Sequence, residues 1–261
     1  TVQFGPTSVA THFNFAARSE RYNVDAISSP ESDVAAVRSA IDGLLRQRVD
    51  AIVLIVVDLD VLAAIQGLEL DIPLVAVAAT SRPHAQLVSI DQYRGARSAV
   101  RHLAESGHRR IHHIAGPARN PDAAERVRGW RDELVARRLD IPPLTYGDWS
   151  AASGFGIAIE SDIAAGDGIF AGNDHMAIGV LSALRERGLR VPEDVGIVGF
   201  DNVPEAAFLH PALTTVEQDF PALGALIMQK VLLVVEQPDV VTEATPLPTR
   251  LIVRQSSVSD G

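Results

Sequence analysis

Apolar residues along the chain form two alternating patterns, short continuous runs and longer stretches of helical period. The run from Ala51 to Val57 has no polar interruption, which is typical of a strand buried on both faces of a sheet. Between residues 34 and 45, apolar residues recur every three or four positions and predict a helix with one buried stripe. We expect this helix to begin at Ser29-Pro30-Glu31, because a capping hydroxyl, a proline and an acidic residue favour a helix N-terminus.

The same alternation continues along the chain and predicts an α/β protein. Further strands are predicted at 73–77, 87–90, 110–115, 168–171 and 195–200, and further helices at 92–106, 123–138, after 150 and at 174–187. A short strand leading into a helix is predicted over 213–220. Gly107 and Gly188 follow two of the helices, where helices commonly end. Strands that alternate with helices form parallel sheets with crossover connections, and the number of units exceeds one doubly wound sheet, so we expect two lobes.

The start of the sequence differs from the usual opening of such a lobe. A doubly wound lobe normally begins with a buried strand, but the residues from Thr1 to Phe4 lead directly into Gly5-Pro6 and a helix. We therefore expect that a first strand is missing from the front of this sequence.

Composition and charge exclude several classes of function. The 261 residues are 47% hydrophobic, which is enough to bury a large core, and 33 acidic against 23 basic residues give a net charge of −10. Such a surface is repelled by nucleic acids and anionic membranes, so this chain is not expected to bind DNA alone. The absence of cysteine excludes disulfides and thiolate chemistry and fits a cytosolic protein. The apolar runs are too short to cross a bilayer, and no signal-peptide pattern is present.

Polar residues gather where predicted strands end, and ligands of α/β sheets bind at the carboxyl ends of strands. Such segments are 147–150, 172–174, 199–202 and 213–220. Together with other motifs they resemble the LacI/GalR family of transcriptional regulators, in order from about Tyr22 to Ser256. The matching segments are Val88 to Asp91 with Gly95 and His102-Leu103, Ser106 to Ile111, Glu125 to Trp130, Phe170 to Ala177, Leu189 to Val195, Gly199 to Asn202, Leu213 to Phe220 and Pro248 to Leu251.

Within the family, three segments look most like the lac-repressor branch: 147–155, 218–220 and Phe4-Gly5-Pro6. The sequence departs from the family pattern at Arg21, where a glycine is usual, and at Gln92, where an asparagine is usual. Both departures concern the N-terminal side of the expected pocket.

The resemblance implies a fold like that of periplasmic binding proteins of type I, with two parallel-sheet lobes, three crossovers and a ligand cleft between the lobes. We expect residues 1–109 with 217–238 in the N-terminal lobe and 110–216 with 239–261 in the C-terminal lobe. The crossovers would lie near residues 109, 216 and 240 and act as hinges. A DNA-binding head would precede this sequence and is absent from it.

The resemblance also implies a set of ligand contacts. They are Arg126, Asn173, Asp201 and Gln218 as polar contacts, Trp149 and Phe220 as flat apolar surfaces, and Phe4 and Arg94 as walls of the cleft. These residue types suit a sugar, because each hydroxyl both donates and accepts hydrogen bonds and the ring offers C–H faces to aromatic side chains.

Each of these residues has a purely structural alternative. Asp201 could cap the helix expected near Pro204, and Asn173 could cap the helix that it precedes. Trp149 taken alone would usually be a packing residue and Arg126 a solvated one, while Gln218 and Phe220 could belong to a hinge and the core. His108, His112 and His113 could suggest a metal, but they span a turn and a strand, so structural histidines are the better interpretation.

The resemblance implies a sensor that binds a small sugar, forms a homodimer and contacts operator DNA only through the missing head. No metal, cofactor or membrane partner is implied, and we expect a cytoplasmic protein. An alternative is a periplasmic sugar-binding protein of a transporter, which shares the fold. An enzyme is not expected, because the sequence has neither a nucleophile motif of the Gly-x-Ser-x-Gly type nor the His-Glu-x-x-His motif.

Overall fold

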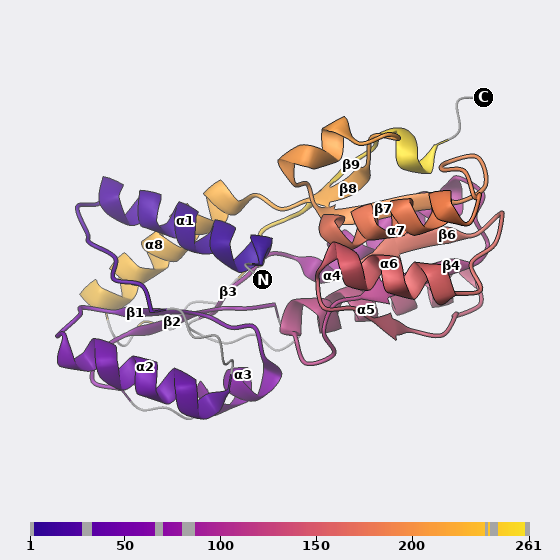
Figure 1. The fold of residues 1–261 in the computed structure, drawn as a ribbon. Helices are drawn as coiled ribbons and strands as arrows, with labels where there is room; N and C mark the ends of the chain where they lie inside the picture. Colours follow the sequence, from indigo (N-terminus) through magenta and orange to yellow (C-terminus); the bar gives the residue numbers. More distant parts are fainter. Residues whose placement is uncertain are drawn as a thin grey trace.

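The structure is a computed structural model, and it describes residues 3–27, 33–65, 70–79, 87–237, 240 and 245–258. Two lobes lie side by side, each with a β-sheet between two layers of helices (Figure 1). This confirms the predicted class, an α/β protein of two doubly wound lobes. Within the described residues, no helix is both long and apolar enough to span a membrane.

The first lobe contains three parallel strands in the order β1 (Ile52–Ile55), β2 (Leu74–Val77) and β3 (Leu87–Val88). Successive side chains of a strand point to opposite faces. Val75 and Val77 therefore pack toward α1 (Phe4–Ser19) and α8 (Phe220–Glu236). Ala76 faces the other side, which is covered by α2 (Val34–Arg46) and α3 (Leu59–Ile65).

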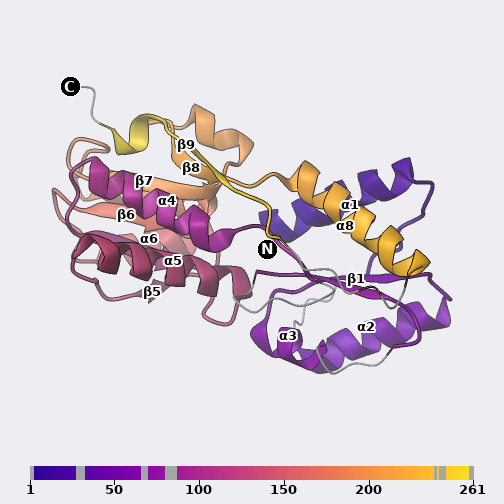
Figure 2. The ribbon, with the colours of Figure 1, turned by 180° about the vertical axis from the view of Figure 1, so that it is seen from behind.

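The second lobe is built on a sheet of six strands. Their order is β5 (Thr145–Tyr146), β4 (Ile111–Ala115), β6 (Gly168–Ala171), β7 (Gly196–Asp201), β8 (Thr214–Glu217) and β9 (Arg250–Ile252). All neighbouring strands are parallel except β9, which pairs antiparallel with β8 at the edge. Helices α6 (Ala151–Glu160) and α7 (Asp174–Glu186) cover one face, and α4 (Gln92–Glu105) and α5 (Pro121–Arg137) cover the other (Figure 2).

The chain passes between the lobes at three places. Two of these crossovers, at residues 89–91 and at Leu247, run side by side, since Leu247 donates to the Ser89 carbonyl at 2.9 Å and accepts from the Asp91 amide at 2.8 Å. The third lies between β8 and α8, at Gln218-Asp219.

The first crossover lies earlier in the chain than the sequence analysis placed it. The boundary was expected near residue 109, which would put residues 92–105 in the first lobe. Instead α4 packs on the second sheet, where Ala99 and Leu103 contact Phe170 and Val198 in one buried cluster. The amphipathic pattern of α4 shows that one side is buried, but it does not show which of the two sheets covers that side.

Helices α4, α5 and α7 begin and end within about two residues of their predicted bounds, and α3 was not predicted. The described part of α2 gives its start. That helix begins at Val34, and the Asp33 carboxylate caps it by accepting a hydrogen bond from the Ala36 amide at 2.7 Å. The start predicted at Ser29-Pro30-Glu31 lies outside the described residues. Gly107 and Gly188 follow α4 and α7 with φ of 103° and 75°, the left-handed backbone that favours glycine at a helix end.

Two glycines of α6 provide a test of the packing between α6 and α7. A Cβ atom at Gly154 would lie 2.2 Å from the backbone oxygen of Met176 in α7, whereas one at Gly156 would meet nothing within 4 Å. We expect Gly154→Ala to lower the free energy of unfolding by roughly 1–3 kcal/mol through overpacking. The matched control Gly156→Ala should raise it by about 0.5–1 kcal/mol, because alanine has the higher helix propensity. Urea denaturation measures both, and equal effects would contradict the packing described here.

Candidate functional site

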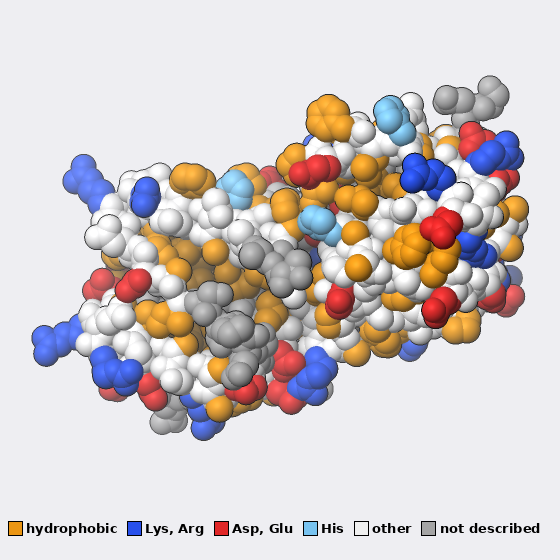
Figure 3. Space-filling view, in the orientation of Figure 1, with side chains coloured by type: hydrophobic (Ala, Val, Ile, Leu, Met, Phe, Trp, Pro, Cys, Tyr) orange, Lys and Arg blue, Asp and Glu red, His pale blue; other side chains and the backbone are white. Residues whose placement is uncertain are grey.

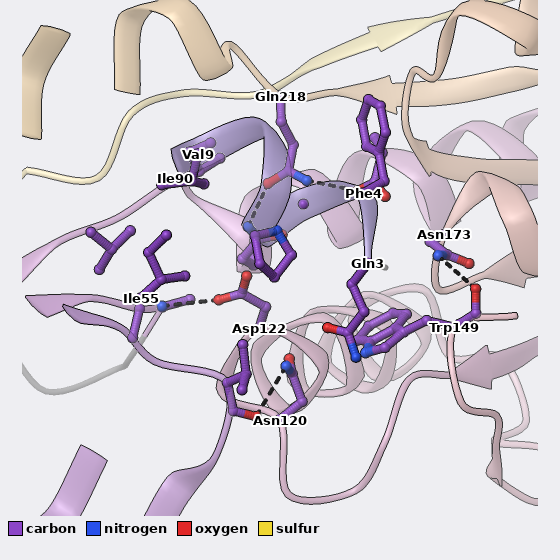
Figure 4. Close-up of a pocket in the computed structure, with 18 of the residues that line it drawn as sticks. Gln3, Phe4, Val9, Ile55, Ile90, Asn120, Asp122, Trp149, Asn173 and Gln218 are labelled. Carbon is purple, nitrogen blue, oxygen red and sulfur yellow. Dashed lines mark hydrogen bonds between the residues drawn. The ribbon is translucent and has the colours of Figure 1, made fainter. Parts of the chain in front are cut away.

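A cavity of about 350 Å³ lies between the lobes. Its walls come from the carboxyl ends of β1 and β2 in the first lobe and from the strand-to-helix turns at residues 148–151, Asn173 and Asp201 in the second lobe. The N-terminal ends of α1, α5 and α8 complete the lining (Figure 4). Parallel sheets bind ligands at this end of their strands, so the cavity is the candidate functional site.

The centre of the site is a buried guanidinium, that of Arg126 in α5. Its Nε donates to Oε1 of Gln92 at 2.9 Å, one Nη donates to the Gly172 carbonyl, and the other lies 3.6 Å from Oδ1 of Asp201. The Phe200 ring lies below the guanidinium with its centroid at 3.8 Å. Only 3% of Arg126 is exposed, so these contacts replace the water that a free guanidinium would bind.

The partners of Arg126 are held in turn by Gln218 at the crossover between β8 and α8. Its amide nitrogen donates to Oδ1 of Asp201 at 2.7 Å, and its amide oxygen accepts from Nε2 of Gln92 at 2.7 Å. The four side chains therefore form a closed network that joins α5, the end of β7 and two of the three crossovers. A network of this kind fixes each side chain in one orientation.

Two buried carboxyl groups lie near this network. Burial raises the pKa of Asp201 to about 6, and Arg126 and Gln218 oppose the shift. Burial and the nearby Asp201 raise the pKa of Asp174 to about 8. Asp174 accepts from the Val203 amide at 2.8 Å and from the Thr215 hydroxyl at 2.6 Å, so its role is to join α7 to β8 and the turn after β7.

Aromatic side chains form the apolar part of the cavity wall. Phe4 at the start of α1 meets Phe220 at the start of α8 edge-on, with ring centroids 5.8 Å apart. Trp149 lies opposite, and its ring centroid is 5.4 Å from the Arg126 guanidinium (Figure 4). Trp149 and Asp201 have φ of 73° and 104°, in the left-handed region. Such a backbone is strained for residues other than glycine and is frequent at ligand sites, although Arg138 adopts it simply at the end of α5.

Seven of the eight residues that the family resemblance implied line the cavity: Phe4, Arg126, Trp149, Asn173, Asp201, Gln218 and Phe220. Arg94 does not. Its side chain is 84% exposed and lies 3.5 Å from the Asp91 carboxylate. The reason is that Asp91 caps α4 and Arg94 lies in the first turn on its outer face, away from the cavity.

The structure also shows whether Asn173 and Asp201 cap the helices that follow them. Asn173 does cap α7, because its Oδ1 accepts from the Met176 amide at 2.9 Å, while its amide nitrogen donates to the Trp149 carbonyl at 3.1 Å. Asp201 does not cap the 3₁₀ helix η1 (Pro204–Phe208), whose first turn has no side-chain cap. Asn173 therefore positions Trp149, and Asp201 faces the cavity.

Other polar residues of the lining were not among the expected contacts. They include Gln3, Ser89, Gln92, Asn120, Asp122, Asp148, Ser150 and His175. The pattern Asn120-Pro121-Asp122 is a helix-start signature shortly after the buried strand β4, and it could have indicated Asn120 and Asp122. Gln92 was recognised only as a departure from the family pattern, and the structure places it in the central network.

The loop before α5 connects the lobes on the side of α3. The Asn120 amide donates to the Val57 carbonyl at 3.3 Å, and Oδ1 of Asp122 accepts from the Ala79 amide at 3.0 Å. The Arg119 guanidinium pairs with Asp58 at 3.0 Å and also with Asp60. These contacts hold the carboxyl ends of β1 and β2 against the second lobe.

The three histidines considered as metal ligands are bonded within the protein. His108 contacts the Gly166 carbonyl at 3.0 Å, His112 the Asp167 carboxylate at 3.0 Å and His113 the Phe170 carbonyl at 2.8 Å. Within the described part of the chain, no three histidine or acidic side chains are grouped as metal ligands would be.

Comparison with known proteins agrees with this geometry. Residues 100–257 match the model of the periplasmic binding protein-like domain. The lactose operon repressor of Klebsiella pneumoniae is 30% identical over 259 residues, covering 97% of this chain and 72% of that protein. The chain belongs to the LacI/GalR family. The lactose operon repressor of Escherichia coli K12 is 29% identical over 231 residues, covering 87% of this chain and 64% of that protein.

Solved structures of LacI-type repressors have the same fold. A lac repressor dimer bound to operator and the anti-inducer ONPF has a TM-score of 0.92 at 27% identity, covering 98% of this chain and 78% of that one. The regulator CelR in complex with cellobiose has a TM-score of 0.84 at 28% identity, covering 96% and 78%. The chain spans between about half and three quarters of the curated LacI-type relatives it matches.

The buried imidazole of His113 gives this LacI-family chain a pH-dependent stability. Desolvation lowers the pKa of His113 from 6.5 to about 4. As the pH falls below 6.5 this imidazole therefore binds a proton in the unfolded chain, whereas in the folded chain it stays neutral until about pH 4. This histidine therefore removes stability as the pH falls from 6.5 to 4, by about 3 kcal/mol. We expect His113→Phe to abolish that loss in urea titrations at several pH values. The same substitution at the exposed His210 should leave it, and an unchanged slope in His113→Phe would contradict the assignment.

Proposed function

We propose that this chain is the effector-binding and dimerisation part of a LacI-type transcriptional regulator, with a small sugar or sugar-like molecule as its effector. The observation that carries the proposal is the cavity between the lobes, in which fixed charged and amide side chains face aromatic surfaces. A sugar offers hydroxyl groups to the first and C–H faces to the second. The cellobiose bound to CelR, a structural neighbour, supports this class of ligand.

The network around Arg126 supports an allosteric role for this site. Gln92 and Gln218 lie at two crossovers, so a ligand that changes their hydrogen bonds also changes the preferred angle between the lobes. A difference of about 1–3 kcal/mol in affinity between two lobe arrangements is sufficient for regulation. A DNA-binding head outside this sequence would respond to the change in the angle between the lobes. A regulator of this kind works in the cytoplasm. The repressor relatives favour this function over the transporter alternative and over an enzyme.

A ligand screen tests the sensor function directly. We expect thermal stabilisation of the protein by one or a few of a panel of mono- and disaccharides, followed by calorimetry to measure the affinity. Asp201→Asn should weaken binding about 10- to 100-fold, because a charged hydrogen-bond acceptor contributes roughly 1.5–3 kcal/mol. The control Arg190→Ala removes a 70% exposed side chain that pairs with Asp194, and it should bind normally. The absence of any sugar-dependent shift would contradict the proposal.

We further propose that two copies associate through the second lobe. Phe208 in η1 is 81% exposed, and hydrophobic side chains also gather over α6 on the same face of the second lobe (Figure 3). Large exposed apolar side chains that cluster in this way mark protein interfaces. The lac repressor structures that resemble this chain include dimers.

Sedimentation velocity tests this interface. We expect Phe208→Asp to raise the dissociation constant of the dimer by at least about tenfold, because it places a charge in an apolar contact. Tyr146→Asp is the matched control, since Tyr146 is 51% exposed on the edge strand β5. A dimer that resists Phe208→Asp, or one that Tyr146→Asp weakens equally, would place the interface elsewhere.

A further inference from the structure

Asp122 introduces a negative charge into the cavity that no expected ligand contact accounts for. It is the second residue of α5, whose first turn is capped by Asn120 through a 2.9 Å bond to the Ala123 amide. One carboxylate oxygen accepts from the Ala79 amide of the other lobe at 3.0 Å, which fixes its orientation. In Figure 4 the carboxylate of Asp122 lies in the middle of the cavity, between the strand of Ile55 and Gln218.

The effect of the Asp122 charge on a ligand depends on its position relative to Arg126. Asp122 and Arg126 are four residues apart on α5, so both side chains face the cavity from the same side of the helix. The Arg126 guanidinium already has Asp201 at 3.6 Å as its counterion. The charge of Asp122 is therefore in excess of what Arg126 neutralises.

The remaining charges of the lining do not reverse this balance. Asp148 adds a third carboxylate, and its hydrogen bonds from the hydroxyl and amide of Ser150 lower its pKa. Among the cavity residues that the structure describes, Arg126 is the only arginine or lysine. A ligand with a carboxylate or phosphate would meet the carboxylates of Asp201 and Asp122 inside the cleft, the exposed carboxylate of Asp148 at its rim, and one cation that already has a partner. Such an arrangement discriminates strongly against anions, because the field is poorly screened in a cleft.

We propose that Asp122 selects the charge of the effector: the cleft admits uncharged polyhydroxyl ligands and excludes those that carry a carboxylate or a phosphate. The inference rests on the proposed function as a sugar sensor and specifies which sugars the site takes. A neutral sugar satisfies the free acceptor capacity of Asp122 with a hydroxyl donor, whereas an anionic group has no proton to donate to it.

Calorimetry with matched pairs of probes tests this: galactose against galacturonate, glucose against glucuronate and glucose 6-phosphate, and lactose against lactobionate. Measurements at about pH 8 favour the ionised form of Asp201, whose pKa is about 6. They also favour the ionised form of Asp122, because burial raises the pKa of this carboxyl while the charge of Arg126 and the hydrogen bond from the Ala79 amide lower it. We expect any neutral sugar that binds to do so at least about 100-fold more tightly than its anionic counterpart. Asp122→Asn retains an oxygen that can accept from the Ala79 amide, and it should reduce this ratio by about tenfold or more.

Two further variants separate charge at this position from charge in general. Asp122→Glu keeps the charge and should keep the discrimination, even if the affinity for the neutral sugar falls. Asp162→Asn removes one negative charge from a 73% exposed side chain that pairs with Arg110, next to the amino end of β4 and away from the cavity. It should leave the ratio unchanged.

Each outcome bears on a different claim. Equal binding of a neutral sugar and its acid by the unmodified protein, or an unchanged ratio in Asp122→Asn, overturns the role of Asp122 while leaving the sugar sensor intact. Binding of an anionic probe alone also overturns it. Binding of none of the probes contradicts the proposed function itself, and the inference falls with it.

Discussion

The buried guanidinium of Arg126 is the interaction on which the arrangement of this molecule depends. A charge removed from water costs several kcal/mol unless its hydrogen-bonding groups find partners. The partners of Arg126 come from separate parts of the chain: Gln92 from the first crossover, Gly172 from the turn after β6, and Asp201 from the end of β7. They meet only when the second sheet and the crossover at Gln92 are correctly placed. The hydrogen bonds of Arg126 therefore fix the positions of Gln92, Gly172 and Asp201 at the cleft.

Two sets of contacts then limit how the lobes move. The paired crossovers at residues 89–91 and Leu247 form a hinge on one side. On the side of α3, Arg119, Asn120 and Asp122 hold the ends of β1 and β2. The second set consists of partly exposed ion pairs of Arg119 with Asp58 and Asp60 and of the hydrogen bonds made by Asn120 and Asp122, and exposed ion pairs contribute little to stability. An opening of the cleft about the paired crossovers would break only the second set of contacts.

Much of the fold could be predicted from the sequence, because period and capping are local properties. The strands from β1 to β8, apart from the short β5, and the helices from α4 to α7 lie close to their predicted positions. The placement of α4 could not be predicted, since its buried face fits either sheet and only the contacts with Phe170 and Val198 decide. β9 was not predicted as a strand, because its pairing with β8 depends on residues more than 30 positions away.

The candidate site shows the same division. Positions such as Arg126 and Asp201 lie within motifs whose order along the chain indicates the family. Asn120 and Asp122 lie in a helix start after a buried strand, which could have indicated that they are near the cleft but not which groups of the other lobe they contact. Arg94 was placed wrongly for a related reason: its position near the cleft in sequence says nothing about the direction of its side chain, which follows the outer face of α4. Side-chain direction depends on packing that the sequence pattern does not contain.

The hydrogen bonds within the cavity also restrict what a ligand can offer. Both ends of the Gln218 amide and both ends of the Asn173 amide are used by neighbouring groups of the protein. Each amide keeps one N–H and one oxygen lone pair for a ligand, beside the free acceptor capacity of Asp201 and Asp122 and the unused donors of Arg126. An effector that joins this network without breaking it must present donors to two carboxylates and an acceptor to one guanidinium at short spacing. Neighbouring hydroxyl groups on a rigid ring meet that requirement, since each hydroxyl donates and accepts at once.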